Sequence, residues 1–239
     1  MKDSKLAAHL ASLTPARINV DRAGTRPKTD TWIAFRRDHA LARDAVLSNL
    51  DAKFLADLKT QYDLPIIESE AKSREAFVLS PPSGKRATLT ALESLDSLPR
   101  DKDVQIVIAD GLSARAVEEN IPDLYPMLLH GFSQKGISTG KAVVVKQGRV
   151  AIADQIAHHL GAKIAINLLG ERPGLSTAES LSAYITYNPG PKTISSDRTV
   201  VSNIHQGGTP ALEAGALIVR LVERILENRV SGVKLQALG

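Results

Sequence analysis

Apolar runs and amphipathic stretches alternate along the second half of the chain. The runs DVQIVIAD, KAVVVKQG and AKIAINLLGE are short, β-branched and almost continuously apolar, which is typical of strands buried on both faces of a parallel sheet. Between them, residues 113–135 and 152–160 carry apolar side chains at helical spacing. Strand, helix, strand, helix and strand in this order predict a βαβαβ unit.

Two further strand candidates and a helix complete this part of the sequence. The strands are expected in LSAYITYNP and RTVVSN, and the apolar stripe of residues 211–227 predicts the helix. Strands that alternate with helices favour an α/β fold with helices on both faces of the sheet. We therefore predict a doubly wound, mostly parallel, Rossmann-like domain over residues 71–239.

The N-terminal part of the chain has a helical pattern instead. Its apolar spacing predicts helices over residues 5–13, 31–50 and 52–61. A short strand over 76–79, a Pro-Pro-Ser-Gly turn and a short helix are expected to follow. We therefore predict a small helical N-terminal region over residues 1–70.

The composition is that of a globular, cytoplasmic protein. Hydrophobic residues make up 43% of the sequence and charged residues 23%, values that exclude a largely disordered chain. No apolar run approaches the roughly 20 residues that cross a bilayer, and the first residues lack the apolar stretch of a secretory signal. The absence of cysteine excludes disulfides, thiolate metal sites and cysteine nucleophiles.

The charge pattern does not favour a nucleic-acid partner. The net charge is +4, but the basic residues are spread among 26 acidic ones. Aromatic residues make up only 4% of the chain, so the stacking platforms of single-strand binders are mostly missing. The basic segment RINVDRAGTRPK keeps a nucleic-acid-binding module as an alternative, which steep salt-dependent retention on DNA would support.

Three loops at the carboxyl ends of the predicted strands are candidates for a ligand site. Ligands of open α/β sheets gather at this edge, because its loops vary without disturbing the sheet and helix N-termini point into the crevice. The loops are residues 109–113, 147–150 and 170–174. In the third, Glu171 and Arg172 stand between glycines and a proline, so they fit either a polar ligand or a salt bridge.

Turn formation explains much of the first two loops. Ser113 is expected to cap the helix that follows, and Gly148 is expected to adopt a backbone conformation that a larger residue would resist. Val150, at the rim of the sheet, fits the core better than a ligand contact when judged by burial preference alone.

Standard nucleotide motifs are missing, and one histidine loop needs its own explanation. Neither G-x-G-x-x-G nor G-x-x-x-x-G-K-[ST] occurs.

SNIHQGGTP contains N-x-H-x-x-G, one residue away from the D-x-H-x-x-G with which a class of cobalamin proteins supplies a histidine to cobalt. Asn203 replaces the carboxylate that would orient the imidazole, so we predict that His205 is hydrogen-bonded within a tight loop and assign no metal ligand. Gly207 and Gly208 are expected to take positive φ angles, and Thr209 to cap the next helix.

Six longer blocks of sequence point to a known family. In order along most of the chain they are DRAGTRPKT, RRDHALARDAVL, ADGLSARA, GRVAIADQI, GERPGLSTAESLSAY and DRTVVSNIHQGGTPALEA. With these blocks the chain resembles the small subunit of ethanolamine ammonia-lyase, an adenosylcobalamin-dependent enzyme. Several blocks in one order are far more specific than any single motif above.

The resemblance implies a shared active complex. A large subunit with a TIM-type barrel would carry the substrate site and most of the radical chemistry, while this chain helps to enclose adenosylcobalamin. The implied reaction is cobalt–carbon homolysis, hydrogen abstraction from ethanolamine by the 5′-deoxyadenosyl radical, and release of acetaldehyde and ammonia. Cobalamin would keep its own dimethylbenzimidazole on cobalt, and no residue of this chain is needed as a catalytic acid or base.

The resemblance also carries three cofactor-binding positions onto this chain. They are Val150 in GRV, Glu171 in GERPG and Val200 after DRT. The first two fall in loops already selected by the sheet-edge rule. Val200 stands where some relatives have cysteine, so it can keep a van der Waals contact but not a thiol-specific one. Some relatives also carry a longer polar leader, so packaging in a bacterial microcompartment stays open beside a cytoplasmic location.

The main alternative is a stand-alone α/β enzyme that acts on a phosphorylated small molecule. Glu171, Arg172 and His205 would then be its catalytic groups. Such an enzyme would turn over its substrate without cobalamin and without a second subunit.

Overall fold

A computed structural model describes residues 9–10, 12–13 and 22–238. Its strands are β1 Arg22–Ala23, β2 Arg26–Pro27, β3 Ile66–Glu68, β4 Val104–Ala109, β5 Val143–Lys146, β6 Ile164–Gly170, β7 Leu181–Tyr187 and β8 Arg198–Ile204. Its helices are α2 Thr29–Leu47, α3 Ala52–Tyr62, α4 Arg74–Leu79, α5 Leu89–Glu93, α6 Ala114–Gln134, α7 Ile152–His159, α8 Ala211–Asn228 and α9 Val233–Gln236, with short 3₁₀ helices η1 Pro81–Lys85 and η2 Ser195–Asp197.

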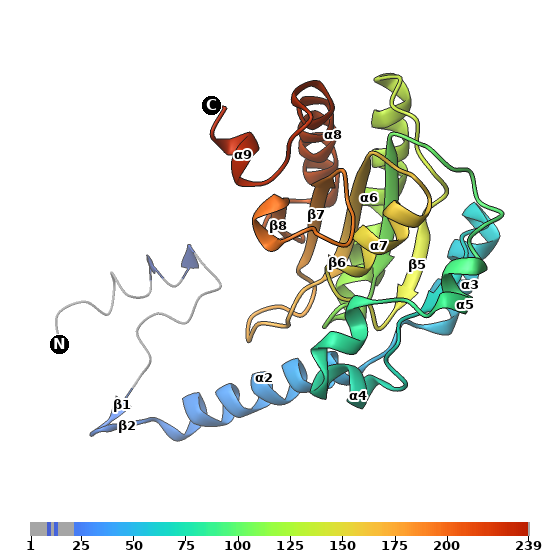
Figure 1. Ribbon diagram of the computed structural model, residues 1–239. Coiled ribbons are helices and arrows are strands. Elements are labelled where there is room, and N and C mark those ends of the chain that lie inside the picture. The colour runs from blue at the N-terminus through green and yellow to red at the C-terminus, as the bar shows by residue number, and fades with distance from the viewer. Residues whose placement is uncertain (1–8, 11, 14–21, 239) are drawn as a thin grey trace.

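Six strands form one mostly parallel sheet, as the sequence predicts (Figure 1). Their order is β3-β5-β4-β6-β7-β8. The first four run parallel, whereas β7 is antiparallel to both β6 and β8. β4 and β6 are buried along their whole length, which explains their uninterrupted apolar sequences.

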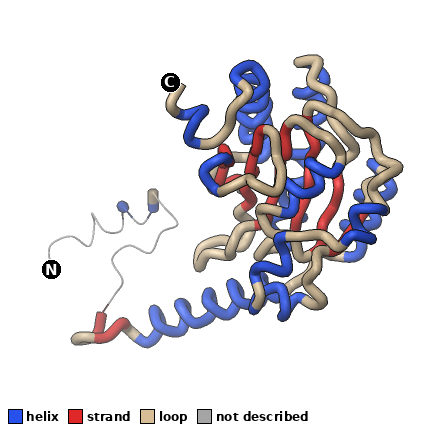
Figure 2. The backbone as a smooth tube through the Cα atoms, in the orientation of Figure 1, coloured by secondary structure: helices blue, strands red, loops and turns tan. Residues whose placement is uncertain are grey.

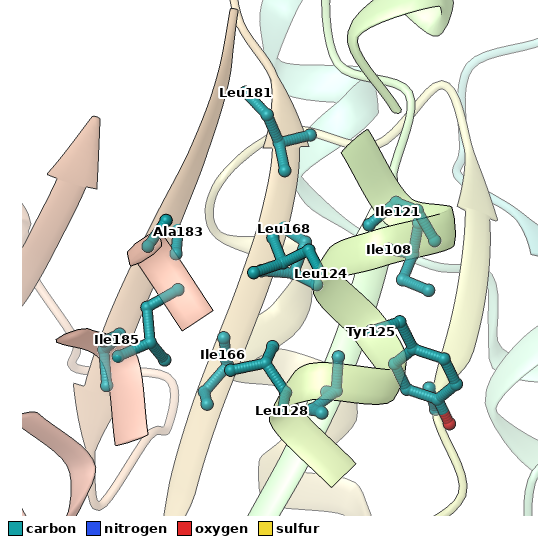
Figure 3. Packing of buried hydrophobic residues seen from close by; sticks show 14 of the residues in the cluster. Ile108, Ile121, Leu124, Tyr125, Leu128, Ile166, Leu168, Leu181, Ala183 and Ile185 are labelled. Atoms are coloured by element: carbon teal, nitrogen blue, oxygen red, sulfur yellow. The ribbon is translucent and has the colours of Figure 1, made fainter. Parts of the chain in front are cut away.

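Hydrophobic residues pack on both faces of this sheet. On one face α6 and α8 cover the strands, and Figure 3 shows Leu124 and Leu128 of α6 against Ile166 and Leu168 of β6. On the other face α7 packs on β4 and β6, with Ile156 at its centre. The predicted helices of the βαβαβ unit are therefore confirmed: α6 is shorter than predicted by one residue at each end, and α7 by one residue at its C-terminal end.

The region before β4 differs most from the sequence prediction. The strand expected at 76–79 is wrong, because these residues lie in α4. Ser73 caps this helix by accepting a hydrogen bond from the Ala76 N–H (3.2 Å), and Phe77 is fully buried. The strand β3, which pairs with β5 at the sheet edge, was not predicted. Helix 31–50 ends earlier, at Leu47, and most of helix 5–13 falls outside the described residues.

α2 projects from the body of the protein (Figures 1 and 2). None of its residues is buried, so packing in the hydrophobic core does not explain why this helix carries large apolar side chains. Large apolar side chains exposed on α2 are Trp32, Ile33, Phe35, Leu41 and Leu47. Farther along, Leu50, Leu58 and Leu64 enter the main core. The division of the chain at residue 70 stays a prediction.

Asp103, the residue before β4, forms several hydrogen bonds and an ion pair. The Asp103 carboxylate accepts hydrogen bonds from the Ser138 N–H (2.9 Å) and hydroxyl (2.6 Å) and from Lys163 Nζ (2.8 Å). Burial by itself raises the pKa of Asp103, but these hydrogen bonds outweigh burial and lower the pKa to about 2.

Asp103→Asn is expected to lower the free energy of unfolding at neutral pH by about 1 to 2 kcal/mol, after allowance for solvent screening at a side chain that is 22% exposed. Because the folded pKa lies below that of the unfolded chain, the wild-type contribution is full above about pH 4 and is lost as the pH falls toward 2. Urea unfolding at several pH values measures it. Asp57→Asn, at an exposed position of α3, is the control; equal losses for both variants would contradict the prediction.

Candidate functional site

The three loops predicted at the carboxyl edge of the sheet do meet there. Asp110 Oδ1 after β4 accepts a hydrogen bond from the N–H of Gly148 after β5 (3.2 Å). The N–H of Leu112 donates to the carbonyl of Gly170 at the end of β6 (2.9 Å). Ser113 caps α6 by accepting from the Ala116 N–H (3.2 Å), as predicted. The sheet-edge rule therefore selects segments that lie together.

A cavity of about 640 Å³ lies beside this edge, on the sheet face that α7 covers only in part. Its floor is formed by β7 and β8, where Tyr184 and Val200 are paired across the two strands. We call it the β7–β8 cavity. Among the residues lining it are Arg149, Val150, Tyr184, Ile194, Arg198 and Val200. Two of the three predicted cofactor-binding residues thus line one cavity.

Val150 reaches the cavity through a loop held from both sides. The N–H of Arg149 donates to the carbonyl of Gly84 (2.7 Å), and Asn167 Nδ2 of β6 donates to the carbonyl of Val150 (3.0 Å). The left-handed residue of this loop is Gln147, with φ 58°, and not Gly148 as predicted. A side chain at Gly148 would lie 2.8 Å from the Cβ of Ala109, so close packing is what requires glycine there.

Glu171 is joined to the same cavity through a tyrosine. The Tyr184 hydroxyl donates to Glu171 Oε1 at 2.5 Å, while the Glu171 N–H donates to the carbonyl of Ser180 (3.0 Å). Burial and the neighbouring Glu171 carboxylate both raise the pKa of Tyr184, so its hydroxyl stays a donor. No further hydrogen bond to the carboxylate comes from the described residues, which leaves Oε2 available to a donor from a ligand. The alternative interpretation, a salt bridge between Glu171 and Arg172, is not seen among the described residues.

Val200 and its neighbour in the cavity wall are unusually exposed for apolar side chains. Val200, the third residue of β8, is 46% exposed, and Ile194 before η2 is 61% exposed. Single exposed apolar residues are common, but these two line one hollow. The cavity therefore offers an apolar surface to a ligand.

A buried ion pair lies behind the Val150 loop. Arg74 Nη1 and Asp110 Oδ2 are 3.1 Å apart, with side chains 3% and 1% exposed. Arg74 Nε also donates to the carbonyl of Val46 near the end of α2 (2.8 Å). From the sequence, Asp110 could be placed only within the candidate loop 109–113, because nothing in the chain pattern indicates that Arg74 of α4 is its partner.

The His205 loop behaves as predicted for a structural histidine. The Gly207 N–H donates to Nδ1 (3.1 Å), so Nε2 carries the ring proton and donates to Asn203 Oδ1 (2.8 Å). The positive φ in the loop belongs to Asn203, at 62°, rather than to the two glycines. The predicted Thr209 cap is also wrong, since Pro210 takes the capping position of α8.

His205 and Val150 do not share a cavity. His205 lines a separate hollow of about 560 Å³ with Glu119 and Asp123 of α6. Glu171, Arg172 and His205, the catalytic set of the stand-alone enzyme alternative, are therefore not gathered at one cavity. Within the described part of the chain, no three His, Cys, Asp or Glu side chains are placed to hold a metal ion, and no helix is long and apolar enough to span a membrane.

The fold and the site define an α/β protein with a cavity on one sheet face and a helix, α2, that has no buried residue. Comparison with known proteins identifies the family. The model of the ethanolamine ammonia-lyase light chain family matches residues 4–236. The chain therefore belongs to this family.

Curated relatives agree with this assignment. Three of them, from three bacteria, are named ethanolamine ammonia-lyase small subunits. That of Clostridium tetani is 46% identical over 223 residues, which cover 93% of this chain and 74% of the relative. That of Clostridium acetobutylicum is 40% identical over 237 residues, covering 99% and 96%. That of Fusobacterium nucleatum is 42% identical over 224 residues, covering 93% and 75%.

Proposed function

We propose that this chain is the small subunit of an adenosylcobalamin-dependent ethanolamine ammonia-lyase, and that the β7–β8 cavity holds one side of the cobalamin. The observation that carries the proposal is the convergence of Val150, Val200 and the Tyr184–Glu171 hydrogen bond on one cavity. These positions come from strands and loops far apart in the sequence. Family membership supports the reaction, and the cavity supports the role of this chain in it.

The cavity fits part of a cobalamin and not the whole of it. Pockets that enclose drug-sized ligands have volumes of roughly 300–1,000 Å³. The β7–β8 cavity, at about 640 Å³, lies within this range, whereas a corrin macrocycle with its nucleotide tail is larger than such ligands. A second polypeptide must then cover the rest, which agrees with the name small subunit given to the relatives.

Each proposed contact follows from the chemistry of the residue. The side chains of Val150, Val200 and Ile194 would pack on the apolar surface of the corrin. Glu171 would accept a hydrogen bond from a corrin amide, held in place by the Tyr184 hydroxyl. When bound, adenosylcobalamin supplies the radical that starts the reaction. This chain would contribute positioning and exclusion of water.

The experiment that tests this role is reconstitution with the large subunit of the proposed enzyme. Cobalamin is titrated into the isolated chain, the isolated large subunit and the complex. The proposal predicts tight binding by the complex only, together with cobalamin-dependent release of acetaldehyde from ethanolamine. Turnover by this chain alone without cobalamin would support the stand-alone enzyme instead.

We further propose that α2 docks on the large subunit, a TIM-barrel protein. Beside its apolar side chains lies a groove of about 490 Å³, lined by Leu41 and Ala45 of α2 and by residues 174–179. Those residues belong to the loop that follows Glu171, whose carboxylate is hydrogen-bonded to Tyr184 of the β7–β8 cavity. A cavity that is completed by a partner must lie next to the interface with that partner.

Ile33→Glu and Leu41→Glu are each expected to weaken assembly with the large subunit at least tenfold, because both side chains are more than half exposed and would be buried by docking. The free energy of unfolding of the isolated chain should change by less than about 0.5 kcal/mol. Analytical ultracentrifugation measures the affinity for the large subunit, and urea unfolding measures the free energy of unfolding. Leu89→Glu, on α5, is the control; assembly that tolerates all three variants would exclude α2 from the interface.

We also propose a domain division and a location for this protein. The sheet would be a doubly wound, Rossmann-like cobalamin-binding domain over residues 71–239, preceded by a helical region over 1–70. The enzyme would act in the cytoplasm or inside a bacterial microcompartment. Fractionation of the source cells would separate the last two.

A further inference from the structure

Cations from three separate elements meet at the β7–β8 cavity. The polar groups involved, which we call the basic wall, are Lys85 of η1, Arg149 of the Val150 loop, Arg198 of β8, and the hydroxyls of Thr193 and Ser195. A neighbouring hollow of about 520 Å³ shares Lys85 and Arg198 with the cavity and adds Arg86. The positive charge therefore continues along the groove.

Nearby acidic groups offset only part of this charge, since Arg86 is paired with Glu70 (3.3 Å) and Asp110 acts on Arg149. Among the described residues that line the two hollows, Asp154 is the one carboxylate. It is committed to an ion pair with Arg198, in which the two side chains are 6% and 9% exposed. Within the described part of the chain, no ion pair involves Lys85 or Arg149. The basic wall thus keeps a net positive charge.

Two buried donors in the basic wall also lack partners. Nε of Arg149 and Nε of Arg198 make no hydrogen bond within the described residues. A buried N–H left unpaired is costly, so such groups call for an explanation. Burial lowers the pKa of Arg149, the charge of Arg74 lowers it further and Asp110 raises it. The guanidinium lies over the Phe77 ring, 4.3 Å from its centroid, and within the described part of the chain no carboxylate forms an ion pair with this positive charge. A bound anion would compensate it.

We infer that the basic wall binds the phosphodiester in the nucleotide tail of cobalamin. The inference rests on the proposed function and names the part of the cofactor that this wall recognises. Guanidinium and ammonium groups both donate charge-assisted hydrogen bonds to phosphate oxygens, and hydroxyls add neutral ones. The Glu171 carboxylate would repel a phosphate, so it is assigned to the corrin amides.

Comparing the binding of two corrinoids distinguishes recognition of the nucleotide tail from recognition of the corrin ring. Cyanocobalamin carries the nucleotide tail, and cyanocobinamide lacks it. In absorbance titrations of the reconstituted complex, Lys85→Gln and Arg149→Gln are each expected to weaken cyanocobalamin binding about tenfold, since each removes a charge-assisted donor. Cyanocobinamide binding should change by less than about twofold in both variants. Arg220→Gln, on the opposite sheet face in α8, is the matched control and should change neither.

Two further measurements complete the test. Competition by phosphate shows whether the basic wall binds a phosphate group, and Glu171→Ala tests the cobalamin cavity independently of the tail. Millimolar orthophosphate should compete with cyanocobalamin and not with cyanocobinamide. Equal weakening of both corrinoids, by phosphate or by the two variants, overturns the tail assignment, and so does unchanged cyanocobalamin binding in both variants. Glu171→Ala is expected to weaken both corrinoids; no change in either would overturn the cobalamin cavity itself.

Discussion

Arg74→Met is expected to lower the free energy of unfolding by about 3 to 5 kcal/mol, the loss typical when one partner of a buried ion pair is removed. The variant leaves Asp110 in the interior without its cation, at a site where both side chains are almost fully buried. It also removes the hydrogen bond from Arg74 Nε to the Val46 carbonyl. Because small domains are stable by only about 5–15 kcal/mol, the loss is a large share of the total.

Urea unfolding measures this loss against an exposed pair. Arg86→Met breaks the ion pair with Glu70, whose side chains are 66% and 39% exposed, and should cost about 0–1 kcal/mol. The double variant Arg74→Met with Asp110→Asn should recover part of the stability, because no charge then stays buried and unpaired and the amide oxygen can still accept from the Gly148 N–H. A loss in Arg74→Met no larger than that in Arg86→Met would contradict a structural role for the pair.

Glu171→Ala is expected to weaken cobalamin binding by the reconstituted complex about tenfold to a hundredfold. A hydrogen bond to a charged group contributes about 1.5–3 kcal/mol, and each 1.4 kcal/mol is a tenfold change in affinity. Assembly with the large subunit should be unaffected, because the Glu171 side chain bonds within this chain to Tyr184. A cobalamin titration followed by absorbance measures the affinity.

Glu223→Ala is the matched control for this titration. It removes a carboxylate of equal size from α8, where Glu223 accepts a hydrogen bond from Lys135 Nζ (2.9 Å) on the other face of the sheet. Cobalamin affinity that is equal in the two variants would show that Glu171 has no part in binding.

The buried strands and long helices could be predicted from sequence because their patterns are local. β4 and β6 have apolar residues on both faces, and α6 and α7 have apolar stripes, so period and composition identify them without tertiary information. The reversal of β7 is not local. It depends on how residues 171–180 turn the chain at the carboxyl edge, which the apolar pattern does not record.

In the candidate site, too, local sequence patterns predicted some residues, while others depend on the tertiary structure. Val150 and Glu171 follow strand ends, so the sheet-edge rule selected their loops. Val200 lies within β8, opposite Tyr184, and could be found only through the family resemblance. The Tyr184–Glu171 bond and the Arg74–Asp110 pair join residues 13 and 36 positions apart, and their partners become evident only in the folded protein.

The most direct test of the central claim is a density map of the reconstituted complex with cobalamin bound. The account predicts the corrin in van der Waals contact with Val150 and Val200, its edge amide near Glu171, and its opposite side covered by the large subunit. A cobalamin enclosed by the large subunit alone, away from the β7–β8 cavity, would contradict it.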